Sequence, residues 1–178
     1  MKKLSLFVFF CLFFAINSCK KTNKVDINYE ALVEQKIKRL EEANTGVTIE
    51  NQPVYFGKDS LKTTKINNLT GKCFFFYFSL NTCTPCIDNA IECIKMVFPD
   101  YLSNDDIIFI SPDYPDRLKD NCYGKKLLTL STGKLGIPLE KEKVPFIFTL
   151  TEQLSIDKIH IVNKNDFTKT VEFLKLKN

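Results

Sequence analysis

The feature that most constrains the fold is an apolar run of eight residues that lies just before a pair of cysteines. Residues 73–80 read Cys-Phe-Phe-Phe-Tyr-Phe-Ser-Leu, and Gly71 and Asn81 bound them. The run is too short for a globular helix, and an almost unbroken apolar stretch of this length is typical of a strand buried on both faces. We therefore expect a central β-strand here, followed at once by the Cys-Thr-Pro-Cys sequence of residues 83–86.

A helix is predicted to begin at this cysteine pair. Apolar residues recur after it at helical spacing, namely Ile87, Ala90, Ile91, Ile94, Val97 and Phe98. Pro85 falls in the first turn, where its missing N–H costs nothing. Because a helix N-terminus stabilises an anion, Cys83 is expected to carry the reactive thiolate. Cys86 lies one turn along on the same face, is better shielded, and is expected to resolve a mixed disulfide on Cys83.

A second buried strand is predicted at residues 107–111, after the helix. Strand, helix and strand in this order form a βαβ unit, which implies a parallel pair with a right-handed crossover. Three further elements follow: a strand at residues 146–150 that Val144-Pro145 introduces, a hairpin partner at 156–162 and a closing helix at 166–176.

Other segments carry weaker signals. Short strands are expected at residues 47–49 and 54–56, a turn at 57–59, a short helix at 115–121, a strand or an irregular segment at 125–130, and a loop at 133–143. Residues 26–45 form a predicted amphipathic helix that ends before Gly46, a suitable C-terminal cap, and packs against the following domain. Residues 46–178 are expected to form one domain with its own core.

The N-terminal segment has the pattern of a signal peptide. A basic start precedes an apolar run at residues 4–16, which is shorter than the ~20 residues that a membrane-spanning helix needs. The following Ile-Asn-Ser-Cys resembles the cleavage box of bacterial lipoproteins, with Cys19 as the lipidated residue; an ordinary secretory signal cut nearby is the alternative. We expect residues 1–18 to be removed and 19–25 to be a tether. The lipid-anchored chain would lie in the cell envelope and face the periplasm.

Charge gives no indication of nucleic-acid binding. Removal of the signal takes Lys2 and Lys3 from the 25 basic residues and none of the 21 acidic residues, which leaves a net charge of +2. The only arginines are Arg39 and Arg117, so no arginine-rich patch exists. This balance accounts for solubility and predicts no nucleic-acid partner.

The order of these elements resembles the thioredoxin fold. Gly-Lys-Asp-Ser at residues 57–60 and the stretch 66–72 before the first strand are similar to the leader of the redoxin branch. That branch holds extracytoplasmic thiol-disulfide oxidoreductases related to the alkyl hydroperoxide reductase/thiol-specific antioxidant superfamily. The resemblance covers about residues 46–176. It implies an α/β three-layer sandwich in which helices flank a central mixed sheet, with residues 26–45 as an N-terminal helical extension.

The resemblance also implies roles for particular residues. Cys83 would attack, Cys86 would resolve, and Pro145 would be cis and lie beside them. Backbone around that proline would pair with the substrate, so Val144 and Pro145 are predicted to contact it. Thr84 and Pro85, within the Cys-x-x-Cys sequence, are predicted to do so too. The partners would be protein thiols or disulfides and an electron donor, with no cofactor or metal. Many tethered members are reductants, which favours the reductase direction.

The chain departs from the family at two positions. Asn81-Thr82 stands where the family has tryptophan before the first cysteine, and Tyr77 stands six residues before Cys83, where thioredoxins carry an acid. In thioredoxins that acid helps to deprotonate the second cysteine. Here the candidate proton acceptors are Glu92, Glu140, Glu142 and water.

The same residues also bear on five other functions that a chain with this cysteine pair could have. A thiol peroxidase would need a Pro-Thr-Cys loop, and Asn81 stands in place of that proline. Copper delivery needs Cys-x-x-x-Cys and a histidine, whereas His160, the single histidine, lies in a predicted strand. Ile87 excludes haem attachment, and no second ligand pair exists for structural zinc. A non-catalytic binding or scaffold lipoprotein with a structural disulfide is the alternative from a different class.

Four of the seven cysteines lie in the signal segment, at the lipidation site or in the Cys-x-x-Cys sequence. The other three are Cys73, Cys93 and Cys122. Cys73 and Cys93 are expected to be buried and to act as small hydrophobic side chains. Cys122 lies in a polar stretch and is a candidate for a second resolving thiol. An odd number in an oxidising compartment implies that at least one stays reduced or pairs between molecules.

Overall fold

The computed structural model describes residues 28–56, 59–70, 73–113 and 124–176. The predicted signal peptide, the tether with Cys19, the helix at 115–121 and Cys122 lie outside these residues. Contacts divide the chain after Val33, so that residues 28–33 belong to one unit and the rest of the described chain to the other. None of the helices described is both long enough and apolar enough to span a membrane.

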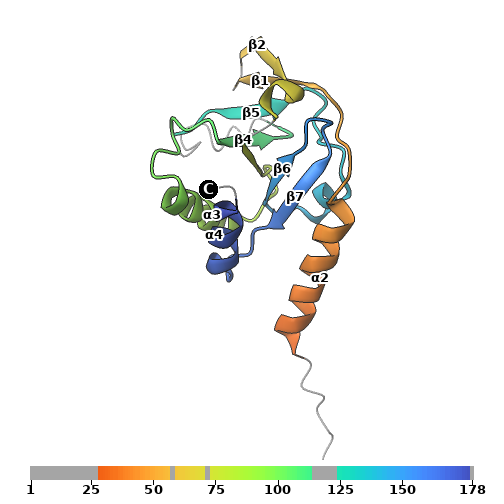
Figure 1. Ribbon diagram of the computed structural model, residues 1–178, viewed down its shortest axis with the longest axis vertical. Helices are drawn as coiled ribbons and strands as arrows, with labels where there is room; N and C mark the ends of the chain where they lie inside the picture. The colour runs from red at the N-terminus through yellow and green to blue at the C-terminus, as the bar shows by residue number, and fades with distance from the viewer. Residues whose placement is uncertain (1–27, 57–58, 71–72, 114–123, 177–178) are drawn as a thin grey trace, which may run out of the picture. The chain divides into compact units, whose positions relative to one another are not determined.

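The elements alternate between strands and helices along the chain (Figure 1). In order they are α2 (Tyr29–Asn44), β1 (Pro53–Phe56), β2 (Asp59–Lys65), the short helix η1 (Ile66–Leu69), β3 (Phe74–Tyr77), α3 (Thr84–Val97), β4 (Ile107–Ser111), β5 (Leu127–Leu130), the short helix η3 (Pro138–Glu142), β6 (Phe146–Leu150), β7 (Ile156–Ile161) and α4 (Phe167–Lys175). The predicted strand, helix and strand around the cysteine pair are therefore confirmed.

The strands form one mixed sheet in the order β2-β1-β5-β4-β3-β6-β7. β3 pairs in parallel with β4, and β4 in parallel with β5, as the βαβ unit requires. The other pairs are antiparallel, including β3 with β6 and β6 with β7. A central β3-α3-β4 unit, joined to a β6-β7 hairpin and a closing α4, is the connectivity of the thioredoxin-like fold. The predicted α/β fold class is confirmed.

Two hydrophobic cores lie on opposite faces of this sheet. From β3, Phe74 and Phe76 enter the core that α3 and α4 cover, whereas Phe75 and Tyr77 enter the other core. Successive residues of a strand point to opposite faces, so a strand with a core on each side is apolar at every position. This alternation explains the unbroken apolar run in the sequence.

Some of the sequence predictions were wrong or incomplete. Residues 47–49 are not a strand but make one isolated bridge, between Thr48 and Ser155. Residues 57–58 of the predicted turn lie outside the described residues, and its last residue, Asp59, begins β2, a strand that the sequence did not predict. β2 lies at an edge of the sheet and reads Asp-Ser-Leu-Lys-Thr-Thr-Lys. Edge strands are often polar, which removes the apolar pattern by which a strand is recognised.

Three further expectations were settled by the structure. The undecided segment 125–130 contains β5, and the predicted loop at 133–143 contains η3. Gly46 follows α2 with a φ of 80°, the left-handed conformation expected of a C-terminal cap.

We predict that Ile94→Ala lowers the free energy of unfolding by about 2–5 kcal/mol, because this α3 side chain is fully buried and its loss leaves a cavity. Urea unfolding followed by circular dichroism measures the change. Met96 on the same helix is 59% exposed, so Met96→Ala is the control and should cost less than about 1 kcal/mol. Equal losses for the two variants would contradict the packing of this helix face.

Candidate functional site

The turn between β3 and α3 is held by hydrogen bonds within itself and by hydrogen bonds to Asp113, which follows β4. The Ser79 amide donates to the Thr82 Oγ1 at 2.9 Å, and the Thr82 amide donates to the Ser79 carbonyl at 3.1 Å. The Leu80 amide donates to Asp113 Oδ1 at 3.4 Å, and the Ser111 hydroxyl donates to the same oxygen at 3.1 Å. Asp113 follows β4, so the turn is fixed to both central parallel strands. This anchoring sets the position of the next residue, Cys83.

Cys83 is the N-cap residue of α3, and Pro85 lies in its first turn. The Cys83 carbonyl accepts hydrogen bonds from the amides of Cys86 and Ile87, both at 3.1 Å. The Cys83, Thr84 and Pro85 side chains are exposed, whereas Cys86 is half-buried. The structure therefore brings four of the predicted site residues together at the start of one helix.

The two thiols are free and lie within hydrogen-bonding distance. Cys86 Sγ donates to Cys83 Sγ at 2.9 Å. Burial, the hydrogen bond to Cys83 and the Cys83 charge together raise the pKa of Cys86 to about 11, although the backbone N–H and the charge of Lys164 act to lower it. At neutral pH Cys86 is thus a protonated donor, and Cys83 is the exposed acceptor. Cys83 and Cys86 therefore differ in exposure and in their part in the hydrogen bond, and their division into an attacking and a resolving sulfur stays a prediction.

Val144 and Pro145 lie at the same end of the sheet as this turn. They directly precede Phe146, the first residue of β6, which pairs with Tyr77, the last residue of β3. Val144 is half-buried and Pro145 is buried, and the Pro145 carbonyl accepts the Val162 amide at 3.0 Å. Their predicted contact with a substrate stays a prediction.

The predicted cis bond before Pro145 was wrong. The described residues contain no cis peptide bond, and the bond between Val144 and Pro145 is among them. The trans form is the ordinary state of such bonds, favoured by about 0.5–1 kcal/mol.

Tyr77, which replaces the acid of thioredoxins, is bonded to an acid from another element. Its hydroxyl donates to Glu140 Oε1 at 2.6 Å. The same carboxylate accepts the backbone amides of Leu135, Gly136 and Ile137, at 2.7, 2.8 and 3.3 Å. Burial, followed by the hydrogen bond to Glu140, raises the pKa of Tyr77 far above its ordinary value. Glu140 therefore joins residues 135–142 to the end of β3, next to the cysteine turn.

The other two candidate proton acceptors are engaged elsewhere. Glu92 pairs with Lys95 at 2.8 Å, and Glu142 pairs with Lys36 at 2.8 Å. The interactions that set the pKa of Cys86 come from burial, Cys83 and Lys164 rather than from Glu92, Glu140 or Glu142.

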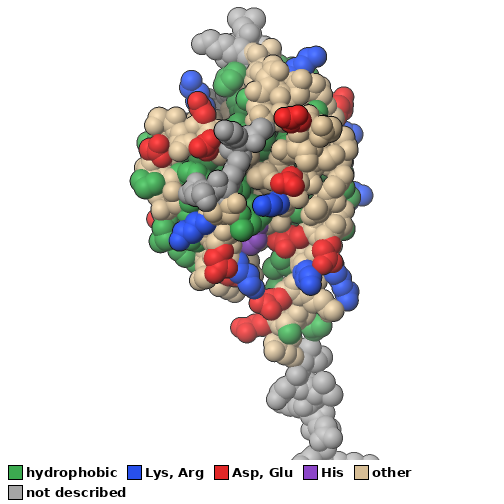
Figure 2. Space-filling model, in the orientation of Figure 1, with side chains coloured by type: hydrophobic (Ala, Val, Ile, Leu, Met, Phe, Trp, Pro, Cys, Tyr) green, Lys and Arg blue, Asp and Glu red, His purple; other side chains and the backbone are tan. Residues whose placement is uncertain are grey.

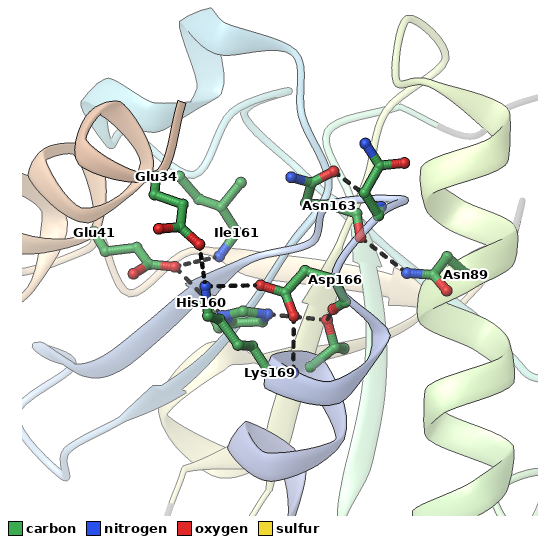
Figure 3. Close-up of polar contacts among 10 residues, drawn as sticks. Glu34, Glu41, Asn89, His160, Ile161, Asn163, Asp166 and Lys169 are labelled. Atoms are coloured by element: carbon green, nitrogen blue, oxygen red, sulfur yellow. Dashed lines mark hydrogen bonds and ion pairs between the residues drawn. The ribbon is translucent and has the colours of Figure 1, made fainter. Parts of the chain in front are cut away.

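Two residues near Cys86 were not found from the sequence. Lys164 provides the backbone N–H described above, and Asn89 Nδ2 donates to the Asn163 carbonyl at 3.0 Å (Figure 3). Both interactions bring the segment after β7 to the start of α3. Asn89 and Asn163, which make one of these contacts, are 74 positions apart in the chain. The one local signal was the spacing of Cys86 and Asn89, which share a helix face.

His160 is a packed residue. Its Nδ1 lies 3.4 Å from Glu41 Oε1, its Nε2 lies 3.0 Å from Thr170 Oγ1, and its ring stacks on Phe173. Figure 2 shows the edge of this histidine at the surface among acidic and basic side chains, and Figure 3 shows it between α2 and α4. Within the described residues, no three His, Cys, Asp or Glu side chains gather as ligands for a metal ion.

The remaining described cysteines are buried, as expected. The Cys73 thiol donates to the Leu69 carbonyl at 2.7 Å, and Cys93 Sγ lies 3.7 Å from the Phe167 carbonyl. Burial raises the pKa of Cys93 to about 11, so this thiol is protonated at neutral pH.

A cavity of about 690 Å³ lies at the other end of the sheet. Cys73, Ile107 and Lys125 are among the residues that line it. Cys73 precedes β3, whereas Cys83 follows it, so this cavity is separate from the cysteine pair.

No protein-family model and no curated protein matches the sequence. Among solved structures, a thioredoxin-like protein from Porphyromonas gingivalis is similar at 18% identity with a TM-score of 0.47, over 74% of this chain and 92% of that chain. The thioredoxin domain of a thiol-disulfide oxidoreductase from Bacteroides vulgatus is similar at 17% identity with a TM-score of 0.45, over 74% and 99%. The bacterioferritin comigratory protein of Xanthomonas campestris is similar at 10% identity with a TM-score of 0.49, over 76% and 99%. These likenesses concern the fold.

We predict that Glu140→Ala destabilises the chain by about 3 kcal/mol, because it leaves the buried Tyr77 hydroxyl and three amides without their acceptor. Glu142→Ala, in the same short helix, removes an exposed ion pair with Lys36 and should cost at most about 1 kcal/mol. Denaturant unfolding of both variants measures the difference. A Glu140→Ala chain as stable as Glu142→Ala would contradict the anchoring role of this carboxylate.

We also predict that Cys83→Ala lowers the pKa of Cys86 below about 11, because the variant removes the hydrogen bond and the negative charge that raise it. Nuclear magnetic resonance of isotope-labelled cysteine Cβ atoms, followed as the pH is raised, measures this. Burial of Cys93 raises its pKa to about 11 without any contribution from Cys83, so its titration is the internal control and should not move. An unchanged or higher pKa of Cys86 in the variant would refute the coupling.

Proposed function

We propose that this protein is a thiol-disulfide oxidoreductase that exchanges disulfides with protein substrates through Cys83 and Cys86, and that it acts as a reductase. One observation carries the proposal: two free thiols lie 2.9 Å apart at the start of α3, one exposed and the other half-buried with a pKa of about 11. Such a pair can transfer two electrons without any cofactor.

The reaction begins at the exposed sulfur. The Cys83 thiolate attacks one sulfur of a substrate disulfide, a bond forms between the two sulfurs, and the other substrate sulfur leaves as a thiolate. Cys86 then gives its proton to water, and its thiolate attacks Cys83 Sγ. This step forms the Cys83–Cys86 disulfide and releases the second substrate sulfur. The substrate is reduced by two electrons, the dithiol is oxidised by two, and an external thiol donor restores it.

The different environments of the two sulfurs support this order. A thiolate is the nucleophile in disulfide exchange, and Cys86 is held as a thiol while Cys83 is exposed to solvent. Premature attack by Cys86 on an incoming disulfide is therefore disfavoured. The exposure of Cys83, Thr84 and Pro85 leaves this sulfur open to a disulfide on the surface of another protein.

The substrate surface would extend from the cysteines across the end of the sheet. Thr84 and Pro85 directly follow the residue with the reactive sulfur. Val144-Pro145 precedes β6, the strand that pairs with the end of β3. We propose that these four residues contact the polypeptide that carries the disulfide.

The sequence supports an envelope location for this reaction. Residues 1–18 would direct export, Cys19 would carry the lipid, residues 19–25 would tether the chain, and 26–45 would precede the catalytic domain at 46–178. A periplasm-facing enzyme anchored in this way would meet exported proteins whose disulfides need reduction.

We predict that the full chain with Cys86→Ala, expressed in its native host, forms discrete covalent adducts on non-reducing gels. Without the resolving sulfur, the mixed disulfide on Cys83 persists. The adducts should vanish when Cys83→Ala is added and should remain when Cys93→Ala is added instead, since Cys93 is buried. Mass spectrometry of the adducts names the substrates.

The contrary results separate the other functions. If no adducts form and the Cys83–Cys86 disulfide of the wild type resists mild dithiols, the chain is a binding or scaffold protein. If the purified chain consumes hydroperoxides through Cys83 and forms no protein adducts, it is a thiol peroxidase.

A further inference from the structure

The segment between β7 and α4 is a loop that is ordered by its own hydrogen bonds and lies against α3 at Asn89 (Figure 3). The Asn163 carbonyl accepts both the Asn89 side-chain amide at 3.0 Å and the Asp166 amide at 3.1 Å. The Asn163 side chain accepts the Asn165 amide at 3.1 Å, and Asp166 caps α4 by accepting the Lys169 amide. These contacts fix the loop on both sides of Lys164.

This loop directs a hydrogen-bond donor at the resolving sulfur. Asn89 lies three residues after Cys86 on α3, so both side chains occupy the same helix face, one turn apart. Asn89 holds the loop at Asn163, and the next residue, Lys164, favours the Cys86 thiolate through a backbone N–H hydrogen bond and through its charge. The charged or titratable groups that act on Cys86 are thus Cys83 on α3 and Lys164 on the loop.

These two groups act at different stages of the reaction. In the free dithiol, Cys83 raises the pKa of Cys86 by its hydrogen bond and its charge. Once Cys83 has formed a mixed disulfide, its sulfur is neutral and that charge is lost. Burial still raises the pKa of Cys86, and Lys164 lowers it because its N–H and its charge favour the thiolate. The contribution of Lys164 therefore matters most when Cys86 must ionise.

We propose that Lys164, held in place by Asn89, is the group that binds the Cys86 thiolate during resolution of the mixed disulfide. The inference rests on the proposed function and adds a residue to its second step. Lys164 acts through its backbone N–H, which hydrogen-bonds to the reacting sulfur, and through its charge, whereas Asn89 acts as a positioning residue.

The test follows the two steps separately on the full chain with a neutral probe, dipyridyl disulfide, which the Lys164 charge does not steer. Reduced protein is mixed with the probe and quenched with acid at short times. Mass spectrometry then measures the Cys83 mixed disulfide and the Cys83–Cys86 disulfide as separate species, so the other cysteines do not interfere. The variants are Lys164→Gln and Asn89→Leu, and the control is Lys158→Gln, an exposed lysine on β7.

We expect formation of the mixed disulfide to be unchanged and its resolution to be slower in both variants. A rise of about one unit in the pKa of Cys86 lowers the thiolate fraction tenfold but makes that thiolate about threefold more nucleophilic, so resolution near neutral pH should be about threefold slower. The deficit should shrink as the pH is raised toward the pKa of Cys86. Lys158→Gln should match the wild type throughout.

Three results would overturn the inference. Resolution in both variants could equal that of the wild type at every pH, or it could be slowed by the same factor at every pH, as a purely structural displacement of Cys86 predicts. The wild type could also stop at the mixed disulfide, which would show that Cys86 does not resolve. The proposed function is judged separately, because missing protein adducts in the host would reject it even where the probe shows the expected effect.

Discussion

The structure depends on the burial of β3 on both of its faces. Phe74 and Phe76 lie in one core, Phe75 and Tyr77 lie in the other, and all four are at most 4% exposed. Burying a side chain of this size contributes about 1.5–3 kcal/mol relative to leaving it in water, so the strand is stable only at the centre of a sheet with a layer on each side. The βαβ unit, the β6 pairing and the cover of α3 and α4 all satisfy this requirement.

The position of the cysteine pair is a consequence of where this strand ends. A rigid central strand gives the following turn a fixed starting point, and Thr82 and Asp113 hold that turn through hydrogen bonds to Ser79 and Leu80. α3 then begins at Cys83 and carries Cys86 into the protein. One sulfur faces solvent and the other is partly desolvated because they lie one helical turn apart at a boundary. The difference in burial between the two thiols therefore arises from the fold.

Two long-range contacts adapt the cysteine site in ways that short motifs do not encode. Tyr77 stands where thioredoxins have an acid, yet a carboxylate still lies against it, supplied by Glu140 from a segment 63 positions away. That carboxylate is fully engaged by one hydroxyl and three amides, which suits an anchor. Near Cys86, Asn89 joins the loop after β7 to α3, and Lys164 of that loop offers its backbone N–H to the Cys86 sulfur. The end of β3 and the start of α3 are thus both joined to segments from the second half of the chain.

The sequence by itself determined the central strand, α3 and the placement of Cys83 and Cys86, because apolar spacing within one continuous segment reports which of its faces are buried. It also determined β4, β6 and β7, whose residues are apolar for the same reason. Only the tertiary structure decided that β2 is an edge strand, that Glu140 is the partner of Tyr77, and that Lys164 meets Cys86. Polar edge strands lack an apolar period, and contacts between distant segments follow from how the whole chain packs. No local pattern carries that information.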